Sequence, residues 1–238
     1  MRSWRLLIWL TVFSVAMAFM ESAVVVYLRE LLYPGGFSFP LAEMEGALAL
    51  TEIIRELSTL IMLMAVAFIA GKSFSMRFAW FIYCFAVWDI FYYVFLMLLI
   101  GWPGSLLEWD ILFLLPLTWT GPVISPLIIT VLMISLAMII VFYSDRGIDT
   151  GIKGREWIIL TAGALVVIMA FTWDYSAYIL EEYSIADLWN LPLNGSLLEY
   201  ASGYIPRRFN WALFTAGALI IVYAILALGL RFRKVEHQ

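Results

Sequence analysis

The chain has 238 residues, of which 64% are hydrophobic and 13% are charged, and its net charge is −4. Its mean hydropathy is +0.96. A soluble domain is typically about 45–50% apolar and about 25% charged. A soluble fold of this size could not bury so much apolar surface, because most of its area must face water. The composition therefore excludes a soluble protein and indicates a single integral membrane domain over residues 1–238, with the lipid bilayer as its main partner.

The chain is poor in the residues that bind transition metals. Cys84 is the single cysteine and His237 the single histidine, next to the C-terminal residue. This excludes an internal disulfide, haem held by two histidines, iron–sulfur clusters, and catalysis by Ser-His-Asp or Cys-His groups within the membrane. P-loop, GxGxxG, HExxH and GxSxG motifs are absent from the sequence. We predict no cofactor other than a possible hard divalent cation, and no nucleic-acid partner.

Six stretches are apolar enough and long enough to cross a bilayer, for which about 20 residues are needed. They are 6–28, 47–70, 78–100, 121–143, 157–180 and 211–231. We therefore predict an all-α polytopic bundle of six transmembrane helices.

A seventh apolar segment, 109–120, is too short to span, and Pro116, Pro122 and Pro126 run through it and beyond. We expect a short Pro-rich interfacial or re-entrant segment before the fourth helix, or a kinked extension of that helix.

The basic residues predict the orientation, because Lys and Arg favour the cytoplasmic side. With the N-terminus inside, only Arg29, Arg207 and Arg208 lie outside, and Arg55 lies within a helix. The inner residues are then Arg2, Arg5, Lys72, Arg77, Arg146, Lys153, Arg155, Arg231, Arg233 and Lys234. We predict a protein of the cell (inner) membrane with both termini in the cytoplasm.

The first helix has a competing interpretation. Ala16-Met17-Ala18 follows a basic and apolar start, which is the pattern of a signal peptide with its cleavage site. The apolar run continues to Leu28, however, and its full length suits a span. We therefore favour an uncleaved first helix.

A five-residue sequence, Thr-Ala-Gly-Ala-Leu, occurs at 161–165 and again at 215–219, each time four residues after a tryptophan. An inverted repeat, as in some transporters, is one interpretation. Close helix packing through small residues is the other, and we favour it because the similarity is short.

Charged residues within the predicted helices are the strongest functional signal. An ionised group at the bilayer centre costs about 2.5–3.5 kcal/mol, so such groups are expected to pair with one another or to line a wet cavity. Glu52, Arg55 and Glu56 share one face of a helix because they are three and four residues apart. The predicted depths place all the acids at mid-membrane or nearer the outer side. The candidate binding residues are Glu21, Glu52, Arg55, Glu56, Asp89, Tyr92, Asp110 and Asp174.

Four chemistries are consistent with such an outward-facing acidic and aromatic pocket. The carboxylates of Glu52, Glu56 and Asp89 suit a hard divalent metal ion. Neighbouring buried carboxylates also suit proton relays. Aromatic faces beside carboxylates suit organic cations. Two of the acids could act as general acid and base on a lipid-like substrate. Structural pairing is the alternative to all four, with Arg55 neutralising Glu52 or Glu56.

The leading hypothesis is a protein that binds or translocates a cationic species or protons. The alternatives are an integral membrane enzyme acting on a lipid or isoprenoid head group, and an accessory subunit of a larger membrane complex. A homo-oligomer remains open under each of these hypotheses.

Three segments carry a resemblance: Trp88-Asp89-Ile90-Phe91-Tyr92-Tyr93, Gly101-Trp102-Pro103, and Leu112-Phe113-Leu114-Leu115-Pro116 leading to Trp119-Thr120-Gly121-Pro122-Val123. Together with Tyr27-Leu28-Arg29 and Arg55-Glu56, they resemble a group of uncharacterised prokaryotic multi-pass membrane proteins. The resemblance covers about residues 21–126. It implies a prokaryotic membrane location, and no activity is assigned to the group.

Overall fold

The computed structural model describes residues 2–115, 117–184, 186–187 and 195–236. Within them it has six long helices, each long and apolar enough to cross a membrane, with mean hydropathies of 1.8 to 2.7. They are α1 (Arg2–Leu32), α2 (Gly46–Ala70), α3 (Phe74–Ile100), α4 (Ile124–Asp145), α5 (Gly154–Ile179) and α7 (Trp211–Glu236). A shorter helix, α6 (Gly195–Ser202), precedes α7. The predicted six-helix membrane bundle is confirmed.

Local capping explains where several helices begin and end. The Ser73 side chain accepts a hydrogen bond from the Met76 amide at the start of α3, and Gly101 ends that helix with a φ of 67°. A residue without Cβ adopts this left-handed conformation at least cost. At the start of α5, the Glu156 carboxylate accepts from the Lys153 amide at 2.7 Å. These caps supply partners for backbone groups that a helix leaves free at its ends.

The segment before α4 is a short separate element and not an extension of that helix. It forms an antiparallel hairpin of β1 (Trp109–Phe113) and β2 (Trp119–Pro122), with Asp110 paired to Gly121. The prediction that it extends α4 as a kinked helix is therefore wrong, and α4 begins at Ile124, not at residue 121. Aromatic and β-branched residues favour strands, and strand pairing satisfies backbone groups that would be costly to leave unpaired in an apolar setting.

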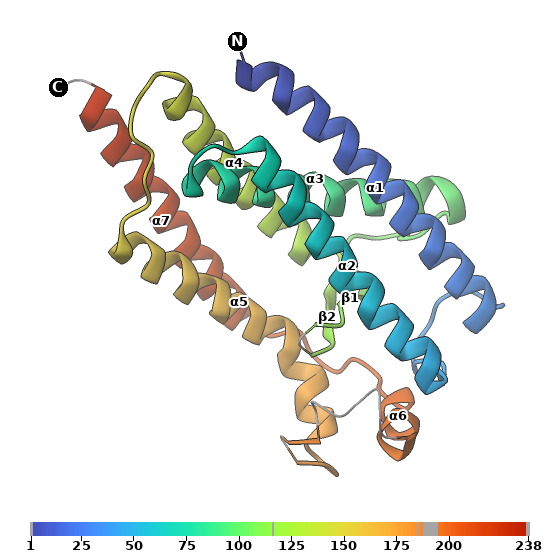
Figure 1. The fold of residues 1–238 in the computed structure, drawn as a ribbon. Coiled ribbons are helices and arrows are strands. Elements are labelled where there is room, and N and C mark those ends of the chain that lie inside the picture. Colours follow the sequence, from blue (N-terminus) through green and yellow to red (C-terminus); the bar gives the residue numbers. More distant parts are fainter. Residues whose placement is uncertain (1, 116, 185, 188–194, 237–238) are drawn as a thin grey trace.

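Helix α3 lies at the centre of one half of the bundle, because α1, α2 and α4 all pack against it (Figure 1). The other half is the antiparallel pair of α5 and α7. It contacts the rest through the hairpin, through α4, and through the ring of Trp157, which packs against Phe74 and Phe78 of α3. The outward faces of the long helices are apolar, as at Trp9, Ile69 and Leu98. Such faces suit a bilayer environment.

The repeated Thr-Ala-Gly-Ala-Leu sequence lies at the contact between α5 and α7. A Cβ built on Gly163 would lie 3.2 Å from the Gly217 carbonyl oxygen, and one on Gly217 would lie 3.0 Å from that of Gly163. The two glycines therefore let the helix backbones approach each other closely. The packing interpretation of the repeat is confirmed.

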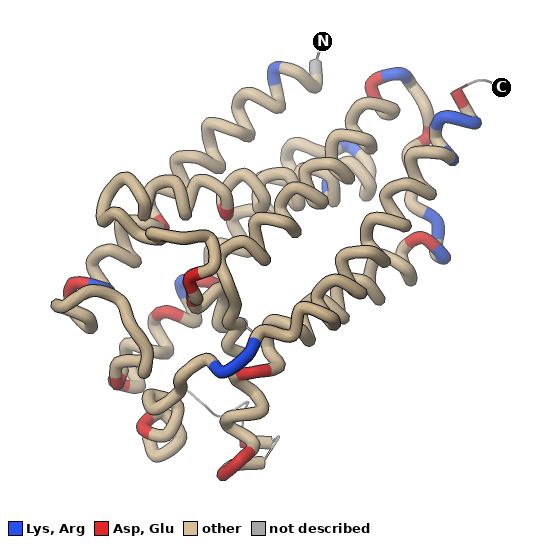
Figure 2. Tube along the Cα trace, turned by 180° about the vertical axis from the view of Figure 1, so that it is seen from behind, with Lys and Arg blue, Asp and Glu red and all other residues tan. Residues whose placement is uncertain are grey.

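Both termini lie at one end of the bundle, here called the terminal end (Figure 1). The segment 33–45 and helix α6 lie at the opposite end, here called the loop end. Most Lys and Arg residues gather at the terminal end (Figure 2). Ion pairs order them there, including Arg231 with Glu156 at 2.6 Å and Arg146 with Glu236 at 2.5 Å.

Candidate functional site

A cavity of about 160 Å³ lies toward the loop end, between α1, α2, α3, strand β1 and the segment 33–44. We call it the acidic cavity. Seven of the eight predicted site residues line it, and the structure thus brings together side chains from four separate elements. They are Glu21, Glu52, Arg55, Glu56, Asp89, Tyr92 and Asp110.

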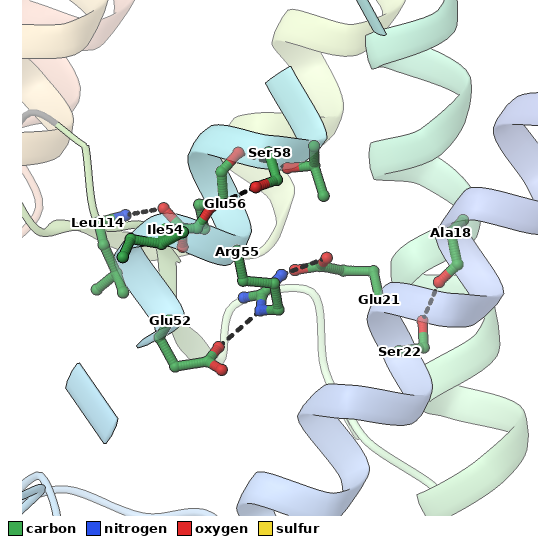
Figure 3. Close-up of polar contacts among 10 residues, drawn as sticks. Ala18, Glu21, Ser22, Glu52, Ile54, Arg55, Glu56, Ser58 and Leu114 are labelled. Atoms are coloured by element: carbon green, nitrogen blue, oxygen red, sulfur yellow. Dashed lines mark hydrogen bonds and ion pairs between the residues drawn. The ribbon is translucent and has the colours of Figure 1, made fainter. Parts of the chain in front are cut away.

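Arg55 joins two helices at the edge of this cavity (Figure 3). Its Nη1 pairs with the Glu21 carboxylate on α1, and its Nε donates to Glu52 Oε2 at 2.7 Å within α2. The predicted pairing of Arg55 with Glu52 is therefore present, and the bond to Glu21 adds a second carboxylate. This triad keeps one negative charge when both carboxylates are ionised.

Glu56 has a different partner from the one expected. Its Oε2 accepts a hydrogen bond from the Leu114 backbone amide at 2.9 Å (Figure 3), and its side chain is buried. Of the two alternatives predicted for Arg55, the structure shows the pair with Glu52 and not with Glu56, because the guanidinium points to Glu21 and Glu52. Glu56 instead fixes the end of strand β1 against α2.

Arg29 is the functional candidate that the sequence missed. It follows directly after the predicted span 6–28, yet it lies in the last turn of α1 and lines the cavity, with 9% of its surface exposed. Its Nη2 donates to Asp110 Oδ1 at 3.2 Å. Its guanidinium carbon lies 3.7 Å from the ring centroid of Trp102 and 4.5 Å from that of Phe37. Such cation–π contacts hold the guanidinium plane in place.

Asp110 lies on strand β1 and is 3% exposed. Besides Arg29, it accepts a hydrogen bond from the Tyr93 hydroxyl at 3.3 Å. Burial raises the pKa of Asp110 to about 6, although the positive charge of Arg29 opposes this rise. Arg29 and Asp110 together therefore form a buried pair that fixes α1 against the hairpin.

Three polar atoms at the cavity-lining residues have no hydrogen-bond partner among the residues that the structure describes. They are Asp89 Oδ2, Trp88 Nε1 and Arg29 Nη1. A buried polar atom without a partner loses its hydration and costs about 1–3 kcal/mol, more when charged. Natural proteins rarely leave such atoms unmatched, and a ligand or an ion is one reason that they do.

Asp174 does not line the cavity, so its predicted membership of the pocket is wrong. It accepts hydrogen bonds from the Tyr204 hydroxyl at 2.8 Å and from the Arg207 and Arg208 amides at 2.9 Å and 3.2 Å. These bonds attach the segment before α7 to the end of α5. Predicted depth alone could not separate this carboxylate from those of the cavity, because both groups lie toward the loop end.

The charge on the cavity wall is unbalanced. Five acids face two arginines, Arg29 and Arg55, which leaves a formal charge of −3 if all are ionised. Within the described ranges, no group of three or more His, Cys, Asp or Glu side chains is placed to hold a metal ion. The wall therefore favours a positively charged group without forming a cage of carboxylates around a metal.

Comparison with protein-family models, with curated proteins and with solved structures finds no significant match to this chain. The function is therefore argued from the cavity itself.

Proposed function

We propose that this multi-pass membrane protein binds a small cationic group in the acidic cavity. The carboxylate of Asp89 carries the proposal, because its Oδ2 is buried without a partner in the described structure while the residue lines the cavity. Glu21, Glu52, Glu56 and Asp110 already have donors. Asp89 is thus the acid with most to gain from a bound cation.

The lining supports an organic ammonium group over a metal ion. Phe85, Trp88 and Tyr92 line the cavity beside Asp89. Aromatic faces attract ammonium groups, and an ammonium needs a single carboxylate where a metal ion needs several oxygen ligands. The divalent cation at Glu52, Glu56 and Asp89 remains a prediction that these contacts do not favour.

The same geometry supports binding over conduction. From Asp89 toward the terminal end, α3 continues into a core in which Trp80 and Cys84 are fully buried. The segments 2–20, 57–70 and 74–88 also contain no Asp or Glu. A cation moving past Asp89 would therefore lose its carboxylate partners.

We place the cavity on the outer side of the cell membrane. The support is the gathering of Lys and Arg at the terminal end, which the positive-inside rule assigns to the cytoplasm. The enzyme and accessory-subunit hypotheses stay predictions.

The test uses the protein in nonionic detergent and measures binding of radiolabelled tetramethylammonium by equilibrium dialysis. We expect saturable binding by the wild type and a loss of at least tenfold in affinity for Asp89→Asn. Glu30→Gln is the matched control, because Glu30 is an exposed acid that does not line the cavity. Equal affinity of the wild type and Asp89→Asn would refute the proposal, as would absence of wild-type binding.

A further inference from the structure

We infer that the ligand is a compact zwitterion, whose ammonium group lies at Asp89 and whose anionic oxygen lies at Arg29. The inference rests on the proposed cation binding and names the class of molecule to which the cationic group belongs. Its basis is that two residues lining the cavity, the acid Asp89 and the cation Arg29, each keep one buried polar atom without a partner in the described structure.

Arg29 is the residue that we expect to bind the anionic group of the ligand. Its Nη2 donates a hydrogen bond to Asp110, and the rings of Trp102 and Phe37 lie against the guanidinium. Its Nη1 is a buried donor without a partner in the described structure. A planar guanidinium donates at its edge and matches carboxylate or phosphate oxygens. A ligand oxygen at this edge would supply the missing acceptor.

Arg55 does not offer the same opportunity. Its Nη1 and Nε are already committed to Glu21 and Glu52. The two arginines of the cavity therefore differ: Arg55 pairs with carboxylates on two helices, whereas Arg29 has a buried nitrogen without a partner in the described structure. Trp88 provides a second unused donor, and it is 6% exposed.

The charge balance limits the ligand further. A simple anion would enter a wall with a formal charge of −3 and be repelled, whereas a simple cation would leave Arg29 Nη1 unmatched. A molecule with both groups satisfies both residues. A cavity of about 160 Å³ is close in size to engineered cavities of about 150 Å³ that hold one benzene molecule, so the two groups must be joined by a short linker.

Quaternary ammonium compounds with a carboxylate or phosphate fit this description, whether as free molecules or as lipid headgroups. The probes are therefore glycine betaine, phosphocholine, tetramethylammonium and inorganic phosphate, each tested by equilibrium dialysis against the protein in nonionic detergent. We expect one or both zwitterions to bind at least tenfold more tightly than tetramethylammonium, and inorganic phosphate to bind least. This ligand series uses the wild type alone, so it does not depend on how any variant folds.

Arg29→Lys and Arg29→Gln then assign the anionic end. We expect each to lower the affinity for the preferred zwitterion about tenfold while leaving that for tetramethylammonium unchanged. Arg208→Gln, which alters an exposed arginine outside the cavity, should change neither. Equal binding of zwitterions and tetramethylammonium by the wild type would overturn the inference and leave the proposed function standing. Failure of all cationic probes would overturn both.

A reconstituted sample separates the two sources of the ligand. In vesicles of phosphatidylglycerol alone, a free zwitterion should bind as it does in detergent. If the headgroup of a lipid is the ligand, adding phosphatidylcholine should raise the apparent Kd of phosphocholine through competition. An unchanged Kd, together with tight binding in detergent, supports a free zwitterion.

Discussion

Arg55 on α2 forms an ion pair with Glu21 on α1, although these helices pack chiefly against α3 and have few backbone contacts with each other. The side-chain bond therefore connects two helices that have little direct backbone contact (Figure 3). Both residues also line the acidic cavity, so the bridge fixes the width of the cavity between α1 and α2.

Removing the guanidinium should loosen this bridge. We expect Arg55→Gln to lower the free energy of unfolding by about 1–3 kcal/mol, less than for a fully buried pair because the Arg55 side chain is 21% exposed. Thermal unfolding in detergent measures the effect. Arg155→Gln, an exposed arginine at the terminal end, serves as the control. A double-mutant cycle with Glu21→Gln should show coupling, and strict additivity would contradict the bridge.

The bond from the Leu114 amide to Glu56 predicts a graded series. Glu56→Gln keeps a side-chain oxygen that can accept the bond, whereas Glu56→Ala leaves the amide unmatched. We expect the alanine variant to lose about 1–3 kcal/mol more than the glutamine variant. Hydrogen exchange should show faster exchange of the Leu114 amide in Glu56→Ala alone. Equal exchange in the two variants would mean that the bond does not hold the hairpin.

The contact between α5 and α7 predicts a steric effect. A Cβ on Gly217 would lie 2.8 Å from Val167 Cγ2 and 2.9 Å from the Val167 amide nitrogen, so Gly217→Ala should push the helices apart. Overpacking of this kind costs about 1–3 kcal/mol. Gly154→Ala is the matched control, because a Cβ there meets nothing within 4 Å. Thermal unfolding should separate the two variants, and a neutral Gly217→Ala would contradict the close approach.

The buried carboxyl of Asp110 predicts a pH dependence. Its pKa rises from an ordinary value of 3.8 to about 6 on folding, so the folded protein binds the proton more tightly. The resulting stabilisation is complete below about pH 4 and is lost as the pH rises through about 6, a change of at most about 3 kcal/mol. Asp110→Asn removes this titration.

The difference in free energy of unfolding between the wild type and Asp110→Asn should therefore shift between pH 4 and pH 6.5. Acids that do not interact with Asp110 titrate alike in both proteins and cancel in the comparison. Glu30→Gln, which changes an exposed acid outside the cavity, is measured over the same range as the control. A constant difference across this range would contradict the raised pKa of Asp110.

The six spans were predictable because bilayer thickness sets a length that an apolar run either reaches or does not. The hairpin was not, because a short apolar segment with prolines has no periodicity that separates a strand from a helix. Its strand pairing also depends on residues Trp109 and Pro122, which meet only after the chain turns back on itself.

Within the site, the contact between Glu52 and Arg55 followed from helical spacing. The bonds of Glu56 to Leu114 and of Arg29 to Asp110 did not, since they join residues 58 and 81 positions apart. One local feature of the sequence points to Arg29. It lies one turn before Leu32, at the end of an apolar run that is longer than a bilayer requires. The long side chain of an arginine at such a position can extend along the helix surface and not only toward the solvent.

The β-hairpin has a mechanical consequence for the whole bundle. Its first strand forms part of the cavity wall and its second strand contacts α5, so one small element touches both halves of the molecule. The two halves are also joined by the contacts of α4 with α7 and of Trp157 with α3. A displacement of β1 from within the cavity would therefore be transmitted through β2 to α5 and its partner α7.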